Sequence, residues 1–173
     1  MARSKWDIVI VGAGHAGIEA ALIATKLGCS VCIITMDKAA IGRMSCNPAI
    51  GGLAKGQIVR EIDVLGGTMA NTADLCALQI KTLNKKKGRA VWSPRAQIDK
   101  RKYEKTAQKL LKKSSVDIIP GEAVAITKEN NAVSGFILRD KTKIFCGCGI
   151  ITAGTFLSGI VHIGERKILA GRM

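Results

Sequence analysis

The sequence predicts an α/β fold with a parallel β-sheet, and three observations support this class. The β-branched run Ile8–Val11 is typical of a buried strand and leads directly into a glycine-rich turn. An Ala-rich helix follows from about His15 to Leu27, and Ser30–Thr35 is a second strand. A strand, a Gly-x-Gly-x-x-Gly turn, a helix and a strand in this order form the dinucleotide-binding fingerprint. We therefore expect a Rossmann-like fold of the FAD/NAD(P)-binding kind, with its βαβ unit in residues 6–37.

Each glycine of this turn has a separate expected role. Gly12 permits the tight turn, Gly14 lets a pyrophosphate approach the backbone, and Gly17 lets the helix pack closely on the strand. The N–H groups at the start of the helix and the positive end of its dipole then face the phosphates. The predicted cofactor-binding residues of this loop are Gly12, Ala13, Gly14, His15, Ala16 and Gly17.

The ribose end of the predicted site departs from the common pattern. An acidic side chain usually ends the second strand of the fingerprint and holds the ribose hydroxyls. Thr35 occupies that position here, and Asp37 follows two residues later. A hydroxyl binds a ribose oxygen more weakly than a carboxylate does. Thr35 is the predicted contact, and Asp37 is the alternative if the loop curls back.

Length and composition indicate one globular domain. The chain has 173 residues, 47% of them hydrophobic and only 3% aromatic, with 19 glycines. This hydrophobicity argues against disorder. No apolar run approaches the length that spans a bilayer. The first residues lead straight into the first strand, so we expect no signal peptide, no membrane association and a cytoplasmic location.

The six cysteines are expected to be reduced thiols. Cys29 and Cys32 form a C-x-x-C pattern, and Cys146 and Cys148 could complete a set of four zinc ligands. Redox C-x-x-C motifs open a helix, however, whereas this one runs into a strand. Cys146 and Cys148 flank a predicted strand, where cysteine serves as a small apolar residue. We therefore expect no metal site.

Basic residues are concentrated in one segment. The formal net charge is +14, and 13 of the 27 Lys and Arg residues lie between Lys81 and Lys113. Only Asp99 and Glu104 oppose them there. Such a segment suits a polyanion such as nucleic acid. It equally suits a solvated helix face that keeps the protein soluble, and charge alone leaves both interpretations open.

Residues 38–114 are expected to hold motif loops and a basic helix. The stretch Met44–Gly56 combines a Cys-Asn-Pro turn with paired glycines that permit close backbone approach to a ligand. A loop of this kind beside a nucleotide fold suits a flavin or substrate, and an ordinary connection is the alternative. A helix is expected at about Gln57–Leu65.

The basic helix is expected to start at Ser93 and Pro94. Serine is a favoured N-cap, and proline is favoured at the first helical position. An apolar stripe at helical spacing follows, and the helix is predicted to end near Lys113. The stripe consists of Tyr103, Ala107, Leu110 and Leu111.

Residues 115–147 are predicted to form a strand at Val116–Ile119 and then a crossover β-meander. The strands of the meander are Ala123–Thr127, Val133–Leu138 and Lys143–Phe145. Residues 148–173 are expected to contain one more buried strand, Gly149–Gly154, and a tail from Ile163 without a convincing element.

These motifs, in this order, resemble those of the glucose-inhibited division protein A family, the large FAD-dependent subunit of a tRNA wobble-uridine modification enzyme. The resemblance covers essentially the whole chain. The Ser-Cys-Asn-Pro-Ala-Ile-Gly-Gly string is its most specific part. The matching stretches are Gly12–Ala21, Ser45–Gly52 with Lys55 and Gly56, Glu61–Asp63 with Leu65–Gly67, Arg95–Gln97, and Gly154–Leu157 with His162–Gly164.

The resemblance implies a flavoenzyme that acts with a GTPase partner on the wobble uridine of certain tRNAs. It adds a carboxymethylaminomethyl or aminomethyl group to C5, using FAD, NADH and methylene-tetrahydrofolate, and it works as a homodimer when full-length. The resemblance implies that Gly12–Gly17 correspond to the family's phosphate-binding loop. It also implies that the backbone at Val124 receives the adenine end of FAD and that Cys46 corresponds to the family's motif cysteine. A thiol near a flavin and a uracil could act as a nucleophile, and a small residue in a turn is the alternative.

Two departures from the family pattern bear on function. Trp92 stands where family members usually have an arginine, so any orienting role of that arginine is in doubt here. Family members are several times longer, so residues 1–173 are expected to be the N-terminal part of an FAD-binding domain, incomplete at the C-terminus. A truncated non-catalytic remnant or a nucleotide- or tRNA-binding module is the alternative. A further alternative is that the chain is related to the folate-dependent tRNA uracil-5-methyltransferases. The sequences of that family fit the Ser45–Gly52 string less closely.

Overall fold

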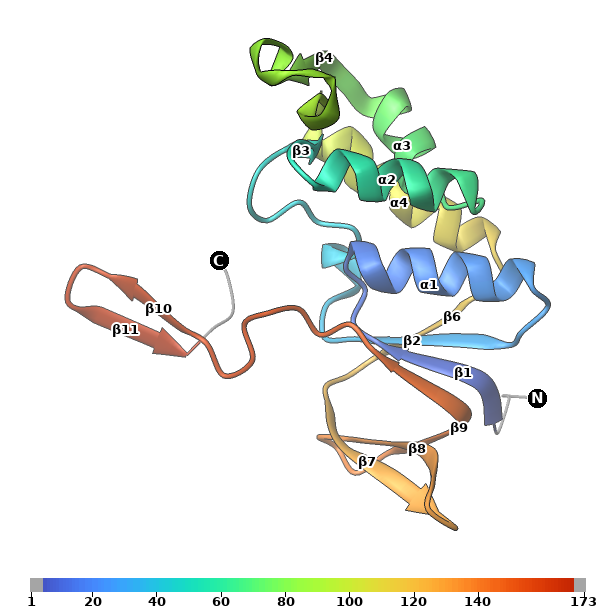
Figure 1. Ribbon diagram of the computed structural model, residues 1–173. Helices are drawn as coiled ribbons and strands as arrows, with labels where there is room; N and C mark the ends of the chain where they lie inside the picture. Colours follow the sequence, from blue (N-terminus) through green and yellow to red (C-terminus); the bar gives the residue numbers. More distant parts are fainter. Residues whose placement is uncertain (1–4, 170–173) are drawn as a thin grey trace.

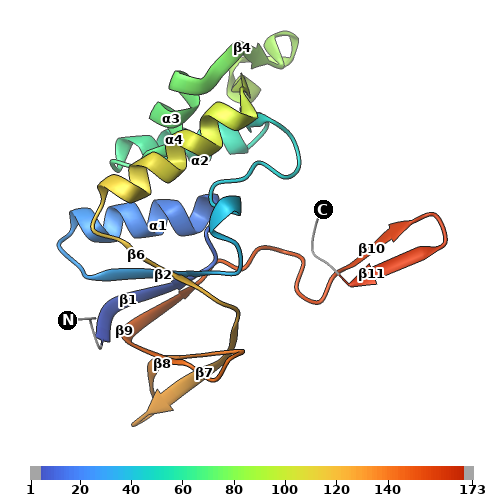
Figure 2. The same cartoon turned by 180° about the vertical axis from the view of Figure 1, so that it is seen from behind.

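The computed structural model describes residues 5–169, which form a six-stranded sheet, a layer of helices and a three-stranded sheet (Figure 1). In Figures 1 and 2 the helices lie between the larger sheet and β4. The helices are α1 (His15–Lys26), α2 (Lys55–Val64), α3 (Met69–Cys76) and α4 (Lys100–Lys113). The strands are β1 (Lys5–Val11), β2 (Val31–Thr35), β3 (Ala49–Gly51), β4 (Ala77–Leu83), β5 (Ser93–Ile98), β6 (Asp117–Pro120), β7 (Ala123–Glu129), β8 (Ala132–Leu138), β9 (Lys143–Ile151), β10 (Ile160–Ile163) and β11 (Arg166–Leu169).

The six-stranded sheet contains the parallel core of the fold. Its order is β6-β2-β1-β9-β8-β7, and β6, β2, β1 and β9 run parallel to one another. The β1-α1-β2 unit forms as its sequence pattern indicates, and Gly28, with a φ of +86°, follows the end of α1. The predicted α/β, Rossmann-like fold with its crossover β-meander is therefore confirmed.

Both faces of the central strands are buried, which explains their continuous apolar sequences. Val31 and Ile33 of β2 belong to a core shared with α1 and α4, which contributes Leu111. Cys32 and Ile34 face the opposite side, in a core shared with Phe136 and Leu138 of β8. Burial, followed by the charge of Asp117, raises the pKa of the Cys32 thiol to about 12, so Cys32 is a neutral packing residue.

The end of the meander differs from the prediction. Lys143–Phe145 and the expected strand at Gly149–Gly154 are one continuous strand, β9. Its first residues pair antiparallel with β8, and from Phe145 onward it pairs parallel with β1. Gly147 resembles a break in the sequence, but a Cβ there would lie 3.3 Å from the Asp7 carbonyl oxygen of β1. The glycine therefore sits where two strands approach closely, and β9 crosses the expected boundary at residue 147.

The predicted helix start at Ser93 and Pro94 is wrong. Both residues belong to β5, the middle strand of the three-stranded sheet β3-β5-β4. The period-two burial of Ala96 and Ile98 against α3 and α4 selects a strand, and Pro94 lies near its start, where a missing N–H is tolerated. Helix α4 instead begins after Asp99, whose Oδ1 accepts hydrogen bonds of 3.0 Å from the N–H groups of Arg101 and Lys102.

Several elements lie where the sequence analysis placed none. They are α3, β3, β4 and the antiparallel hairpin β10–β11, which extends away from the body in both views (Figures 1 and 2). All four residues of β11 are exposed, so β11 has no buried face that would require alternating apolar and polar residues in the sequence. The hairpin occupies part of the tail that was expected to lack structure, whose residues 170–173 lie outside the described residues. Within residues 5–169 no helix has the length and apolar character to cross a membrane.

The position of the α4 cap gives a first prediction. Replacing Asp99 with Ala removes the acceptor for two backbone N–H groups and should lower the free energy of unfolding by about 1 kcal/mol. Asp99→Asn keeps a side-chain oxygen in the same place and should retain most of that stability. Urea unfolding followed by circular dichroism measures both. Equal losses in the two variants would contradict a capping role.

Candidate functional site

The carboxyl ends of four parallel strands meet along one edge of the six-stranded sheet. Gly12 follows β1, Thr35 ends β2, Gly121 follows β6, and Thr152 follows β9. Backbone hydrogen bonds hold these ends in register, including Gly12 N–H to Ile34 O at 2.9 Å and Gly121 N–H to Thr35 O at 2.9 Å. Ligands of doubly wound sheets bind at such an edge.

The three glycines of the phosphate loop differ in their surroundings. Gly12 has a φ of +107°, which favours glycine, and a Cβ there would collide with the Thr152 carbonyl oxygen. A Cβ on Gly17 would collide with the Gly12 carbonyl oxygen and lie 2.8 Å from Thr152 Oγ1. A Cβ on Gly14 would meet nothing within 4 Å. Gly12 and Gly17 are thus required by packing, whereas Gly14 borders open space.

Thr152 holds the loop in place, and the sequence analysis did not single it out. Its N–H donates to Val11 O at 2.8 Å, and its hydroxyl lies 3.0 Å from Val11 O and 3.1 Å from Gly12 O. The only sequence signal is a polar residue directly after an apolar strand. Its contact with residues about 140 positions earlier depends on the pairing of β9 with β1.

Helix α1 presents its N-terminus to this edge. Its N-cap residue is Gly14, and no side chain caps its first N–H groups. These donors and the helix dipole are therefore available to an anion. The loop residues Gly12–Gly17 predicted as phosphate contacts all lie here, between the end of β1 and the first turn of α1.

His15 connects the loop to the helical layer. Its ring packs edge-on against Tyr103 of α4, with centroids 5.5 Å apart and an interplanar angle of 82°. Its Nδ1 is buried and has no hydrogen-bond partner among the described residues. Burial lowers the His15 pKa, and the nearby Glu19 carboxylate opposes this effect. Glu19 in turn accepts hydrogen bonds from the Thr68 N–H at 2.9 Å and the Thr68 hydroxyl at 2.7 Å.

The predicted ribose contacts lie at the end of β2. The Thr35 hydroxyl donates to the Asp37 carbonyl oxygen at 3.3 Å. The Asp37 carboxylate is already engaged, because Oδ1 accepts from the Ala39 N–H at 2.8 Å and Oδ2 lies 3.9 Å from Arg43. Both side chains thus have partners within this turn, and the ribose contact remains a prediction for Thr35 with Asp37 as the alternative.

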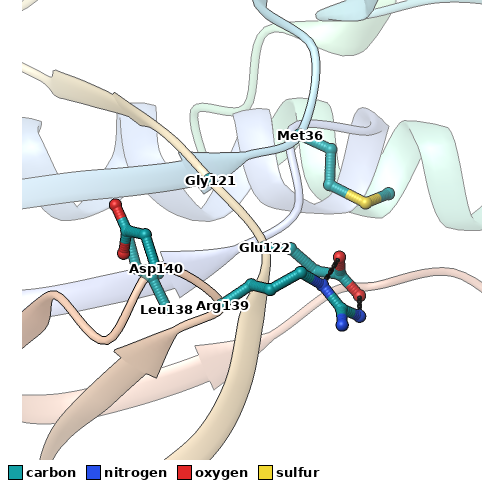
Figure 3. A pocket seen from close by; sticks show the side chains of 6 residues that line it. All are labelled: Met36, Gly121, Glu122, Leu138, Arg139 and Asp140. Carbon is teal, nitrogen blue, oxygen red and sulfur yellow. Dashed lines mark hydrogen bonds and ion pairs between the residues drawn. The ribbon is translucent and has the colours of Figure 1, made fainter.

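A cavity of about 460 Å³ lies at the same edge, lined in part by Met36, which follows Thr35 in the chain (Figure 3). In it Arg139 donates two hydrogen bonds of 2.6 Å to the Glu122 carboxylate, which lowers the pKa of Glu122. Glu122 and Arg139 are not recognisable as site residues from the sequence, since they meet only when β6, β7 and β8 assemble. The cavity is lined by Met36, Gly121, Glu122, Leu138, Arg139 and Asp140.

Val124, on β7, follows the cavity residue Glu122 by two positions in the chain. It falls at the register shift between Ala123 and Ala125, where the β7–β8 ladder is interrupted. Its side chain is exposed. The structure thus brings the phosphate loop, Thr35 and Val124 to one side of the parallel sheet, together with Glu122.

Cys46 lies elsewhere, in the segment Ile41–Asn47 that precedes β3. It is exposed, whereas Ile41 and Met44 in the same segment are buried in separate cores. Gly51 and Gly52 follow, with φ values of +88° and +100°. Cys46 therefore lies on the segment that connects the carboxyl edge of the parallel sheet to the three-stranded sheet. Among residues 5–169 there is no group of three or more His, Cys, Asp or Glu side chains placed to hold a metal ion.

The contrast between Gly17 and Gly14 gives a second prediction. Gly17→Ala should lower the free energy of unfolding by about 1–3 kcal/mol, because the new methyl group overpacks the α1–β1 contact. Gly14→Ala is the matched control and should change stability by less than about 1 kcal/mol. Chemical denaturation measures both, and equal effects would refute the packing role of Gly17.

The buried His15 gives a third prediction. Because its folded-state pKa lies below the ordinary value of 6.5, folding favours the neutral ring. The stability that the neutral His15 ring contributes to the folded protein is fully present above pH 6.5, and it is lost as the pH falls through the lowered pKa. The free energy of unfolding, measured in urea between about pH 7.5 and 5.5, should therefore fall more steeply for the native protein than for His15→Gln. Parallel profiles would rule out this linkage.

Comparison with known proteins identifies relatives of this chain. The family described as "Glucose inhibited division protein A" matches residues 7–173. The "tRNA uridine 5-carboxymethylaminomethyl modification enzyme MnmG" of Sulfurihydrogenibium sp. strain YO3AOP1 is 49% identical over 172 residues, 98% of this chain and 28% of that enzyme. The equally named protein of Bdellovibrio bacteriovorus is 45% identical, covering 100% of this chain and 27% of that enzyme.

Solved structures agree with this relationship. GidA of Aquifex aeolicus, in its form II crystal, superposes with a TM-score of 0.93 at 43% identity, over 99% of this chain and 29% of that chain. The GidA-related protein of Thermus thermophilus has a TM-score of 0.67 at 18% identity, over 97% of this chain and 61% of that chain, a likeness of fold alone. The chain thus spans somewhat more than a quarter of the length of the curated relatives. On its sequence and its structure, the chain belongs to the glucose-inhibited division protein A family.

Proposed function

We propose that residues 1–173 are the N-terminal part of the FAD-binding domain of a tRNA-modifying flavoenzyme. The observation that carries this proposal is the phosphate loop, where an uncapped helix N-terminus and the open space at Gly14 lie at the carboxyl ends of parallel strands. The named activity of the relatives supports tRNA uridine as the substrate. The reaction adds a carboxymethylaminomethyl or aminomethyl group to C5 of the wobble uridine, with a GTPase partner.

The residues present fit an FAD molecule. Gly12–Gly17 and the first N–H groups of α1 would hold the pyrophosphate. The Thr35 hydroxyl and the Glu122 carboxylate would bind ribose hydroxyls, and the backbone at Val124 would receive the adenine. When bound, FAD supplies the redox chemistry of the reaction. The hydrogen bonds from Arg139 lower the pKa of Glu122 and orient its carboxylate, whose oxygens can each accept a further hydrogen bond.

The remaining assignments belong to the full-length enzyme. NADH would supply reducing equivalents and methylene-tetrahydrofolate would supply the carbon, while the basic segment from Lys81 to Lys113 binds tRNA phosphates. The enzyme is a homodimer and works in the cytoplasm. Cys46 is the nucleophile, and its exposed position in the Ile41–Asn47 segment leaves its thiol accessible to a substrate.

The site divides into two functional parts under this proposal. The βαβ unit of residues 6–37 and the strand and meander of residues 115–147 hold the cofactor. Residues 38–114 carry the motif loops and the basic surface, and residues 148–173 supply the strand end with Thr152 that fixes the phosphate loop. The nucleophile therefore comes from a different part of the chain than the cofactor contacts.

Cofactor binding is the deciding test. The purified chain, mixed with FAD and passed through a desalting column, should retain a yellow colour and flavin absorbance. Gly14→Ala should bind FAD at least about tenfold more weakly, because its methyl group occupies the space of the pyrophosphate. Its unfolding free energy should stay close to that of the native protein, which serves as the control.

Failure to bind FAD even at millimolar concentration would overturn the flavoenzyme assignment for this chain. The alternative would then be a nucleotide- or tRNA-binding module without redox function. An equal FAD affinity in Gly14→Ala would leave a flavoprotein but would overturn the assigned position of the pyrophosphate.

A further inference from the structure

The hairpin of β4 and β5, residues 77–98, carries an unusual excess of positive charge. Its residues include six Lys or Arg side chains and no Asp or Glu. Two 3-10 turns, Lys85–Lys87 and Arg89–Val91, connect its strands, and these turns lie far from the six-stranded sheet (Figures 1 and 2). The basic side chains are Lys81, Lys85, Lys86, Lys87, Arg89 and Arg95.

Two of these cations face each other directly across the ladder. Lys81 pairs in register with Arg95, and neither side chain has an ion-pair partner among residues 5–169. Like charges directly opposite each other on antiparallel strands destabilise a sheet. The arrangement therefore costs stability in the free protein and favours a bound anion that lies between the two cations.

A cavity of about 230 Å³ lies over this pair, lined by Gln79, Lys81, Leu83, Arg95 and Gln97. Gln79 is opposite Gln97, so two carboxamides lie beside the two cations on one face of the sheet. A carboxamide both donates and accepts hydrogen bonds, as the polar edge of a base or a ribose requires. Cations for a phosphate and carboxamides for the adjoining base or sugar together suit a nucleotide.

The cavity adjoins the glycine pair of the motif loop. Gly51 pairs with Arg95, and a Cβ on Gly51 would collide with the Pro94 carbonyl oxygen. A Cβ on Gly52 would lie 3.9 Å from Arg95 Cδ and 4.0 Å from Leu83 Cδ1. The absence of side chains at these two positions therefore brings the segment that follows Cys46 against the cavity wall.

Trp92 adds an aromatic surface at the end of the hairpin. Its side chain is 40% exposed, and its Nε1 donates to the Lys85 carbonyl oxygen at 3.3 Å, which fixes the ring. The Arg89 guanidinium lies 5.9 Å from the ring centroid. An exposed, oriented aromatic ring among cations is the usual platform on which single-stranded bases stack.

The basic surface of α4 lacks these features. Its aromatic residue, Tyr103, is buried in the core, and its Lys and Arg residues lie on a regular helix surface. A surface of this kind binds phosphates without regard to base or strand conformation. The hairpin therefore differs from α4 in having both a stacking ring and a cavity.

We propose that single-stranded RNA binds along the β4–β5 hairpin. One base stacks on Trp92, Lys85–Lys87 and Arg89 bind neighbouring phosphates, and Lys81 with Arg95 holds another phosphate beside Gln79 and Gln97. The proposal rests on the proposed function, in which RNA is the substrate, and it identifies the surface that receives an unpaired segment.

Tryptophan fluorescence tests the stacking directly, because the only other tryptophan, Trp6, is buried. A seven-residue oligouridylate should quench the emission of the native chain. Trp92→Phe should show little quenching and retain most of the affinity, measured by fluorescence anisotropy of labelled RNA. Trp92→Ala should bind roughly ten- to a hundredfold more weakly. Circular dichroism confirms that both variants are folded.

Paired charge variants test the cavity. Lys81→Gln with Arg95→Gln should lower the slope of log affinity against log salt by about 1.4, the value for two contacts on a single strand. Lys128→Gln with Lys143→Gln, on β7 and β9 outside the basic segment, removes the same number of charges and should leave both the salt slope and the quenching of Trp92 unchanged. The proposal is overturned if oligouridylate does not quench Trp92, if Trp92→Ala binds as the native chain does, or if both charge pairs have equal effects.

The FAD test remains independent of these outcomes. A chain that binds FAD but shows no stacking on Trp92 would overturn the hairpin proposal and leave the proposed function in place. A chain that binds oligouridylate through Trp92 but not FAD would overturn the flavoenzyme assignment instead.

Discussion

The close contact of α1 with β1 and β9 is the constraint on which the rest of the structure depends. Gly17 has no side chain, so the first turn of α1 lies directly against the Gly12 carbonyl oxygen and Thr152. This contact aims the uncapped helix N-terminus at the edge where four parallel strands end. The same helix carries His15 and Glu19, whose contacts with Tyr103 and Thr68 attach the helical layer.

Two differently charged regions result from this arrangement. The edge of the parallel sheet offers backbone N–H groups and one ionised carboxylate, Glu122, which suit a neutral ribose and a pyrophosphate. The three-stranded sheet offers cations and carboxamides. The segment Ile41–Asn47 joins them, with Ile41 in the core of the first and Met44 in the core of the second. Cys46 therefore lies between the proposed cofactor edge and the proposed RNA surface.

Local sequence patterns predicted the secondary structure correctly except where a tertiary contact favoured a different structure. Ser93 and Pro94 satisfy the rules for a helix start, yet the burial of Ala96 and Ile98 makes them part of a strand, and Asp99 caps the helix. Two separate strands were expected on either side of residues 146–148, yet pairing with β1 on one side and β8 on the other makes β9 continuous. In both places the energy of long-range packing exceeds the local preference.

By itself, the sequence determined the βαβ unit, the turn at Gly12, the end of α1 near Leu27 and most of the meander, because each follows from neighbouring residues. It also predicted the glycine loop and Thr35 as cofactor contacts, and the family resemblance added Val124. Only the tertiary structure decided that Thr152 holds the loop, that Glu122 meets Arg139, and that Lys81 faces Arg95. These contacts depend on strand register and strand order, which the packing of distant segments selects and no local pattern encodes.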